Sequence, residues 1–276
     1  MFADLYGVAR HEVGVSWNND GEKHHRALYG FGHVSMRHPT KPDRYLVSRS
    51  RSPEVVEASD IYEYTLDSEP VTPLPQGIRG YGELVIHGEI YKARPEVNSV
   101  CHHHCPAFMP LLATGTDYMP VFHLGSVGGI RPPFWDQRDE FGDTNMLVIK
   151  PEEGASLARA LGKHWMVLMM RHGVSVAGTS VRDCVFRSVY SARNAAYQVM
   201  AMTIGSDIAT LSPGETMLAG QISSKTTGLT RSWEYWSMRV TKTGGLSPST
   251  GRKSSAKRRS APAKRRGPKR TRKKRR

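Results

Sequence analysis

The amino-acid sequence predicts an α/β sandwich, in which helices cover a β-sheet. Short apolar segments bounded by Gly, Pro and Asp alternate along the chain with longer segments whose apolar residues recur every three or four positions. This alternation of strand-like and helix-like segments is typical of the α/β class. The chain has 276 residues, of which 38% are hydrophobic, so it can bury one substantial core. We therefore expect one domain over residues 1–246.

The positive charge of the chain is concentrated at its C-terminal end. The sequence has 39 Lys and Arg residues against 25 Asp and Glu, but 15 of the basic residues and no acidic residue lie in 252–276. Residues 247–276 contain no bulky apolar side chain, so burial cannot offset the entropy lost on ordering them. We expect this segment to be a disordered tail that can bind polyanions non-specifically.

The N-terminal half begins with a predicted β-hairpin. Residues 29–37 and 45–48 are strand-like, and the turn between them contains two prolines and an aspartate. Residues 59–66 are expected to turn into a third strand, and the Pro- and Gly-rich residues 70–80 to form a loop. Upstream of the hairpin, only a short helix over 5–13 is indicated.

A helix and a strand are predicted next. Residues 82–93 have a helix-compatible composition and end before Pro95, which disfavours helical geometry at the residue ahead of it. Glu83 and His87 are four residues apart and therefore share one face of that helix, where His87 could either support a site or pack against a neighbour. Residues 97–104 are expected to form a strand.

The second half of the chain continues the alternation. Residues 119–124 favour another strand, and the acidic and aromatic residues 134–139 favour a loop. Residues 151–161 begin with proline and acidic residues and are followed by glycine, which indicates a helix. Residues 165–170 are purely apolar and predict a buried strand. Apolar positions recur at threes and fours in 181–204, which predicts a long helix.

The sharpest chemical feature is the run of three histidines in the strand predicted at 97–104. Side chains alternate along a strand, so His102 and His104 point to one face, whereas His103 and the two flanking cysteines point to the other. Two imidazoles on one side can chelate a divalent metal ion. His172 follows a separate buried strand that the sheet could bring close. Three neutral imidazoles would leave one coordination position open for substrate.

Two other interpretations of these histidines stay open at the level of sequence. The three residues could form a polar loop that binds nothing. Alternatively, Cys101, His103 and Cys105 share one face of the strand and could form a closed structural zinc site, although a fourth ligand is missing nearby.

These residues, in their order and spacing, resemble the class II aldolase and adducin family. The resemblance extends over about residues 25–220. It rests on Glu83, the run HGEIYKARP at 87–95, the His-rich strand, and the later Arg171, His172 and Gly173.

The resemblance implies a three-layer αβα sandwich around a mostly antiparallel central sheet. It also implies that His102, His104 and His172 bind one divalent metal ion per chain, usually zinc, and that Glu83 transfers protons. Manganese, cobalt and iron also suit a site of three histidines.

The sequence departs from the sugar-phosphate aldolases of this family at two turns that hold the phosphate. The first turn reads Gly32-His33-Val34-Ser35 in place of Gly-Asn-(Val/Ile)-Ser, and the second is replaced by a segment containing Arg49 and Arg51. Guanidinium forks match planar carboxylates, so a carboxylic acid is the expected substrate if either arginine faces the cleft; both could equally be surface charges. His33, Ser35 and His123 are further candidates for substrate contact.

This variant is similar to a branch of the family that includes decarboxylases of the dihydroxyphthalate type. That similarity implies a metal-dependent carbon–carbon lyase that removes CO2 non-oxidatively from a hydroxylated aromatic carboxylic acid. Two alternatives stay open. One is an aldolase that cleaves a sugar phosphate or hydroxy acid, and the other is an adducin-like interaction protein without enzymatic activity.

The remaining expectations concern the setting of the protein. By resemblance we expect a homo-oligomer, a tetramer, that binds a small-molecule carboxylate substrate. Three cysteines are too few for a disulfide framework, which favours a reducing compartment. The purest apolar run, 165–170, is far shorter than the ~20 residues of a membrane span. We therefore expect a cytoplasmic protein with no membrane span.

Overall fold

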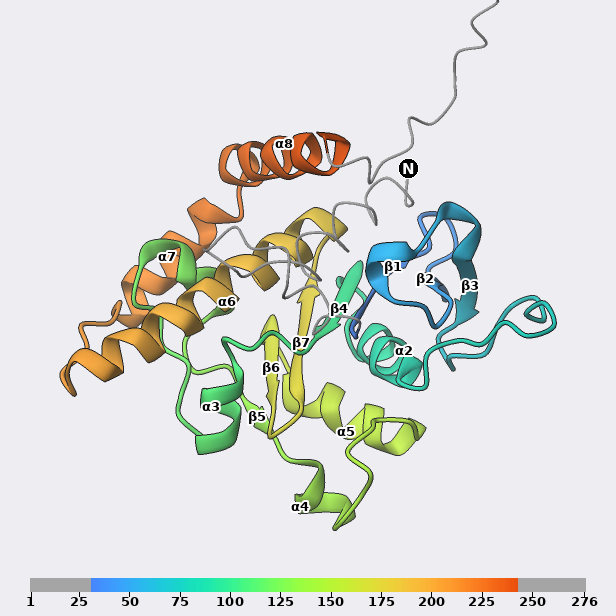
Figure 1. The fold of residues 1–276 in the computed structure, drawn as a ribbon, viewed down its shortest axis with the longest axis horizontal. Helices are drawn as coiled ribbons and strands as arrows, with labels where there is room; N and C mark the ends of the chain where they lie inside the picture. Colours follow the sequence, from blue (N-terminus) through green and yellow to red (C-terminus); the bar gives the residue numbers. More distant parts are fainter. Residues whose placement is uncertain (1–30, 243–276) are drawn as a thin grey trace, which may run out of the picture. The chain divides into compact units, whose positions relative to one another are not determined.

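The computed structural model describes residues 31–242, which form a seven-stranded sheet with helices on both faces (Figure 1). All neighbouring strands are antiparallel except the last two, which are parallel. The predicted α/β sandwich with a mostly antiparallel sheet is therefore confirmed. In spatial order the strands are β3 (Ile61–Thr65), β2 (Arg44–Ser48), β1 (His33–Arg37), β4 (Ser99–His103), β7 (Gly173–Gly178), β6 (Met166–Met169) and β5 (Phe134–Trp135).

Helices form the two outer layers (Figure 1). One face of the sheet is covered by α2 (Leu84–Ala93) and α5 (Pro151–Leu161), which pack against each other. The other face is covered by α6 (Val181–Ile204), and α3 (Met109–Thr114) and α8 (Thr226–Lys242) pack against α6. The remaining helical segments are α4 (Gln137–Phe141), α7 (Pro213–Ser223) and the 3-10 helices η2 (Pro53–Val55), η3 (Ala58–Asp60) and η4 (His123–Gly128).

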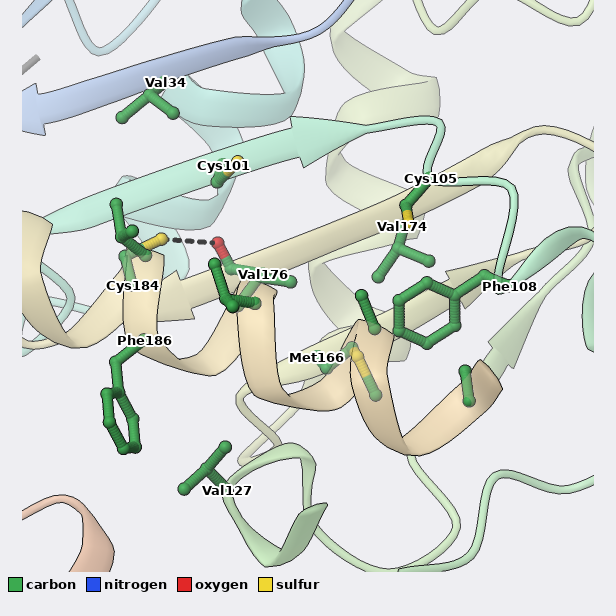
Figure 2. Close-up of a cluster of buried hydrophobic side chains, with 14 of the residues drawn as sticks. Val34, Cys101, Cys105, Phe108, Val127, Met166, Val174, Val176, Cys184 and Phe186 are labelled. Carbon is green, nitrogen blue, oxygen red and sulfur yellow. Dashed lines mark hydrogen bonds between the residues drawn. The ribbon is translucent and has the colours of Figure 1, made fainter. Parts of the chain in front are cut away.

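Each face of the sheet packs on its own group of buried apolar side chains. Val34, Cys101, Val176 and Met166 stand opposite one another across four strands, so they point to the same face. They belong to the core under α6, where Figure 2 shows them beside Cys184 and Phe186. The core under α2 and α5 includes Tyr45, Val47, Ile86, Ile90, Val100 and Leu157.

A buried arginine fixes α2 against the sheet. The guanidinium of Arg37 on β1 donates hydrogen bonds to four main-chain oxygens, those of Pro42 (2.7 Å), Val97 (2.9 Å), Tyr91 (2.9 Å) and Arg94 (3.1 Å). Two of these oxygens lie at the C-terminal end of α2, where carbonyl groups lack helical partners and a cation is favoured. The position of α2 relative to β1 is thereby set.

Most predicted elements lie where the sequence places them. The hairpin consists of β1 and β2, the third strand is β3, and the His-rich and apolar segments are β4 and β6. The three predicted helices are α2, α5 and α6, and α6 has the predicted bounds 181–204. The helix predicted at 5–13 and the tail predicted at 247–276 lie outside the described residues.

The strand predicted at 119–124 is wrong. Its first residues are bonded to α6, and only the last two, 123 and 124, belong to η4. Asn194 on α6 accepts the N–H of Val121 (2.8 Å) and donates to the oxygen of Met119 (2.8 Å), whose N–H is accepted by Gln198 (2.9 Å). Side chains of α6 thus make the hydrogen bonds to these main-chain groups that a neighbouring strand would otherwise make.

Other elements differ from the expectation or were not predicted. The loop expected at 134–139 contains β5 and the start of α4, and β7, α3, α7 and α8 were not anticipated. β7 has the sequence GVSVAG and is buried at every position. A strand buried on both faces needs no alternation of polar and apolar side chains. The two-residue period by which a strand is recognised in a sequence is therefore absent here.

Replacing Asn194 with alanine should destabilise the protein, because the N–H of Val121 and the oxygen of Met119 would lose their partners. We expect the free energy of unfolding to fall by about 2–4 kcal/mol, measured by urea denaturation. Asn98→Ala removes an exposed amide and is the control, with an expected change below about 0.5 kcal/mol. Equal effects of the two variants would contradict this account of the segment.

Candidate functional site

Four ionisable side chains from separate segments meet beside β4. His102 lies on β4 and His104 follows this strand directly, His172 lies in the turn between β6 and β7, and Glu83 immediately precedes α2. One ligand-type atom from each residue lies within 4.8 Å of the others. The structure thus brings together the three predicted metal ligands and the residue predicted to transfer protons.

The Nε2 atoms of the histidines and the carboxylate of Glu83 lie close together. Nε2 of His102 is 3.1 Å from Nε2 of His104 and 3.8 Å from Oε2 of Glu83. Nε2 of His172 is 3.5 Å from Oε1 of Glu83, and the His172 ring is stacked on that of His104 at 5.1 Å between centroids. All four side chains therefore present electron-pair donors to one small volume.

Neighbouring groups orient two of these side chains. Nδ1 of His102 is 3.2 Å from Oγ of Ser175, which stands opposite it on β7 and whose hydroxyl donates to the sulfur of Met169 (3.4 Å). Ser175 therefore accepts the Nδ1 proton, which leaves the lone pair of His102 Nε2 directed at the cluster. Oε1 of Glu83 accepts the N–H of Val148 (3.0 Å).

Burial keeps the imidazoles neutral. Removal from water lowers the pKa of His102 far below its usual value, lowers that of His104, and lowers that of His172 to about 4. Burial raises the pKa of Glu83, and the hydrogen bond from Val148 offsets this rise in part. Neutral imidazoles have a lone pair for a metal ion, and a carboxyl with a raised pKa keeps its proton to a higher pH than a carboxyl in water.

This set of atoms fits a divalent metal ion. Zinc bonds to nitrogen and oxygen of about 2.0–2.2 Å place tetrahedral ligand atoms about 3.3–3.6 Å apart. The two Nε2 atoms of His102 and His104 are 3.1 Å apart, the distances from His172 and His102 to Glu83 are 3.5 and 3.8 Å, and all four ligand-type atoms lie within 4.8 Å of one another. In addition, Nδ1 of His172 is buried and lacks a hydrogen-bond partner within the described part of the chain, so no bond to a protein group holds that ring in another orientation. His102, His104 and His172 can therefore hold the ion, with Glu83 at its side.

A tight turn delivers His172 to the cluster. Arg171 has a positive φ of 58°, and its guanidinium pairs with Asp136 at 2.7 Å. Gly173 follows, and a Cβ atom at this position would lie 2.7 Å from the oxygen of His103 and 2.9 Å from Cδ2 of His104. The glycine therefore permits the close approach of β7 to the histidine segment.

His33 and Ser35 both lie on β1, on the face of the sheet that carries His102. The ring of His33 lies 5.2 Å from that of His102, which stands opposite it on β4. Ser35 is fully buried, and both residues are hydrogen-bonded to His87 of α2. His33 thus borders the cluster, whereas Ser35 lies behind it.

Arg49 and Arg51 share one buried carboxylate. Nε of Arg49 is 2.5 Å from Oδ1 of Asp60, and Nη1 of Arg51 is 2.8 Å from Oδ2. Although burial opposes it, hydrogen bonds from Arg49, from the main chain of Glu57 and from Arg51 lower the pKa of Asp60 to about 2. Tyr81 connects Arg51 to the site. Its hydroxyl donates to the main-chain oxygen of Arg51 (2.7 Å), and its ring lies 4.6 Å from that of His33.

His123 lies apart from these residues in the described contacts. It is exposed at the start of η4, which packs on α6 and α7, and its ring contacts Phe122. No described contact joins it to the four cluster residues.

The closed zinc site considered for the two cysteines is not formed. Figure 2 shows Cys105 near Val174 and Phe108, and Cys101 belongs to the same apolar core. Burial raises the pKa of Cys101 to about 12 and that of Cys105 to about 11, so both are neutral thiols. Within residues 31–242, the metal-type cluster contains no cysteine.

Sequence reasoning missed several residues that shape the site. Ser175 and Asp60 were not anticipated, and Tyr81 and Tyr91 were not singled out. Only Tyr91 left a usable signal, because it is four residues after His87 and therefore lies on the same face of α2.

The chain is similar to several known proteins. Residues 21–199 match the family model described as Class II Aldolase and Adducin N-terminal domain. Decarboxylase tropJ of Talaromyces stipitatus is 31% identical over 245 residues, which cover 80% of this chain and 90% of that protein. A 3,4-dihydroxyphthalate decarboxylase of Arthrobacter keyseri is 28% identical over 179 residues, covering 60% of this chain and 68% of the relative.

A solved structure shares the fold. An aldolase II superfamily protein from Pseudomonas syringae superposes with a TM-score of 0.69 at 16% identity, covering 88% of this chain and 94% of its own.

Replacing His104 or His172 with alanine should abolish metal binding, because each change removes one of three converging Nε2 atoms. We expect one zinc ion per wild-type chain and close to none in either variant, measured by mass spectrometry of zinc-loaded, desalted protein. His164→Ala, which removes an exposed histidine, should keep the full content. A wild-type protein that retains no metal would refute the assignment of the cluster.

Replacing Gly173 with alanine should displace the histidines, because the added Cβ would press on His103 and His104. We expect zinc affinity to fall by about 10- to 100-fold, as for changes that reorient metal ligands, measured by calorimetric titration. Gly205→Ala is the matched control, since a Cβ atom added there would have no neighbour within 4 Å. Unchanged affinity in folded Gly173→Ala protein would show that the close approach is dispensable.

Proposed function

The chain belongs to the class II aldolase and adducin family, and from this premise we propose that it is a divalent-metal-dependent carbon–carbon lyase. Its reaction is the non-oxidative decarboxylation of a hydroxylated aromatic carboxylic acid. The observation that carries the proposal is the cluster of three neutral histidines around a buried glutamate, next to His33. The relatives named as decarboxylases support the choice of reaction.

A divalent ion held by His102, His104 and His172 would supply Lewis acidity to oxygen atoms of the substrate. Zinc is the favoured ion because imidazole ligands suit it, and manganese, cobalt or iron are the alternatives. We propose one ion per chain.

Glu83 is the proton donor in this proposal. Decarboxylation breaks the bond between the ring carbon and the carboxylate, CO2 departs, and the electron pair left on the ring carbon takes up one proton. A carboxyl whose pKa is raised by burial can hold that proton until the bond breaks. The N–H of Val148 fixes Oε1, so the carboxyl keeps its direction toward the cluster.

The substrate carboxylate is held on the side of the cluster where His33 lies. Arg49 and Arg51 are proposed to act on the same group, with Asp60 fixing both guanidinium groups through one nitrogen each. Two arginines with one aspartate leave a net charge of +1, which suits a carboxylate. His123 is kept as a candidate for contact with a substrate bound at a neighbouring subunit.

Two alternatives predict different outcomes at the same site. An aldolase would release an aldehyde or ketone and no CO2. An adducin-like interaction protein would have no reason to gather four buried or partly buried ionisable side chains around one point, because removing such groups from water costs free energy unless they are used. The cluster therefore favours an enzyme.

We further propose a homotetramer in the cytoplasm. Large apolar side chains are exposed on the C-terminal half of α6 and on α7, which suits contact with other subunits: Tyr197, Met200, Met202, Ile204, Met217, Leu218 and Ile222. Within residues 31–242 no helix is both long and apolar enough to cross a bilayer. Residues 247–276 are proposed to bind polyanions through their charge alone.

The test is CO2 release by zinc-loaded protein from a panel of ortho-hydroxylated aromatic acids that includes dihydroxyphthalates. We expect release that chelation abolishes, with His104→Ala as the blank. Glu83→Gln should lower kcat by about 10²- to 10⁴-fold while it keeps its metal. Glu152→Gln changes an exposed glutamate of α5 and should leave kcat unchanged.

Two other outcomes of these assays would contradict different parts of the proposal, the reaction and the role of Glu83. Release of an aldehyde or ketone from sugar phosphates or hydroxy acids, with no CO2 from the panel, would establish the aldolase instead. Near-normal turnover in Glu83→Gln would remove the proton-donor role.

A further inference from the structure

A chain of buried hydrogen bonds leads from the site into the core between β1 and α2. Nδ1 of His33 is 2.6 Å from Nε2 of His87, and Nδ1 of His87 is 2.6 Å from Oγ of Ser35. Oγ of Ser35 is in turn 2.7 Å from the hydroxyl of Tyr91. His87, Ser35 and Tyr91 are at most 1% exposed, and His33 is 5% exposed. Three short bonds in series therefore connect His33 to groups that water does not reach.

The far end of the chain determines its direction. The hydroxyl of Tyr91 has one proton, and burial raises the pKa of Tyr91, which keeps that proton in place. Within the described contacts the hydroxyl has a single hydrogen-bond partner, Ser35. A buried donor without an acceptor is costly, so Tyr91 donates to Ser35.

Each following bond has a fixed direction for the same physical reason. Ser35 accepts from Tyr91 and donates its own proton to Nδ1 of His87. Burial lowers the pKa of His87 to about 3, so this imidazole is neutral and has one proton, which is on Nε2 and is donated to Nδ1 of His33. The reverse direction would leave the proton of Tyr91 or of Ser35 without an acceptor in the described interior.

We propose that this chain holds His33 as the Nε2–H tautomer, so that His33 is a fixed hydrogen-bond donor to a carboxylate oxygen of the substrate. The two ring nitrogens of an imidazole point in different directions, and Nδ1 points at His87. Nε2 is therefore directed away from α2, on a ring that lies between Tyr81 (4.6 Å) and His102 (5.2 Å). The identity of the accepting oxygen rests on the proposed function; the tautomer does not.

This assignment separates His33 from the histidines of the cluster. With Nδ1 accepting from His87 and Nε2 protonated, neutral His33 has no lone pair for a metal ion or for a proton. It is thus neither a fourth ligand nor a general base, and a donor in a dry site favours an oxygen with negative charge.

The chain positions His33 and does not conduct protons. A net transfer along it would leave a phenolate at Tyr91, which is buried and has no contact with solvent through which it could recover a proton. His87, Ser35 and Tyr91 are therefore positioning residues. Ser35, expected from sequence to touch the substrate, acts here through His87.

Nitrogen NMR of zinc-loaded protein labelled at histidine tests the tautomer directly. We expect His33 and His87 both to show a protonated Nε2 and an unprotonated Nδ1, with signals assigned by their loss in His33→Gln and His87→Gln. A protonated Nδ1 on His33 would overturn the proposal. This readout needs no substrate, so it stands even if the proposed reaction is wrong.

Tyr91→Phe removes the hydroxyl that sets the direction, while it keeps the ring. We expect a second His33 signal with a proton on Nδ1, and KM for the carboxylate substrate raised about fivefold, the weight of one neutral hydrogen bond. Tyr64→Phe is the matched control, because its hydroxyl is also buried but makes no hydrogen bond within the described chain. If Tyr91→Phe left the His33 signals as in the wild type, the role of Tyr91 in fixing the tautomer would be refuted.

Ser35→Ala checks the same chain one bond closer to the site. It should produce the same two His33 forms, without loss of bound zinc. A single Nε2–H form in this variant would show that the chain does not set the tautomer.

Discussion

The antiparallel pairing of β4 with β1 on one side and β7 on the other is the constraint on which the site depends. This register places His33, His102 and Ser175 opposite one another on a single face of the sheet. The next row, which includes Cys101, points to the other face and into the core under α6. A shift of one residue in β1 or in β7 would turn His33 or Ser175 to the other face of the sheet, away from the site. The chemistry of the site and the packing of the fold are therefore fixed by the same hydrogen bonds.

Burial gives these side chains their chemical character. Imidazoles removed from water stay neutral, and neutral imidazoles have the lone pairs that a metal ion requires. The helix that covers this face contributes Glu83, His87 and Tyr91, which are spaced four residues apart and so lie along one side of it. Arg37 holds the end of that helix against β1, so its side chains meet those of the sheet in a fixed arrangement. The side chains of such a site are already held in their orientations before a substrate binds.

Much of the fold and the centre of the site could be predicted from the sequence, because they depend on local patterns. The period of α6 gave its bounds, and alternation along β4 placed His102 and His104 together and His103 apart. Where the local pattern was weak, prediction failed. The segment 119–124 is strand-like in composition but is bonded by side chains of α6, and β7 is buried on both faces and shows no alternation.

The sequence by itself determined which side chains share a face of one element, since helical and strand periods act over a few residues. It also determined the family, because the order and spacing of the motif residues can be recognised in the sequence alone. Only the tertiary structure decided which elements meet. The partners His33 and His87 are 54 positions apart, and both Arg49 and Arg51 are paired with Asp60 at the end of η3. Such pairings follow from strand register and helix packing, and these are properties of the assembled core that no short stretch of sequence contains.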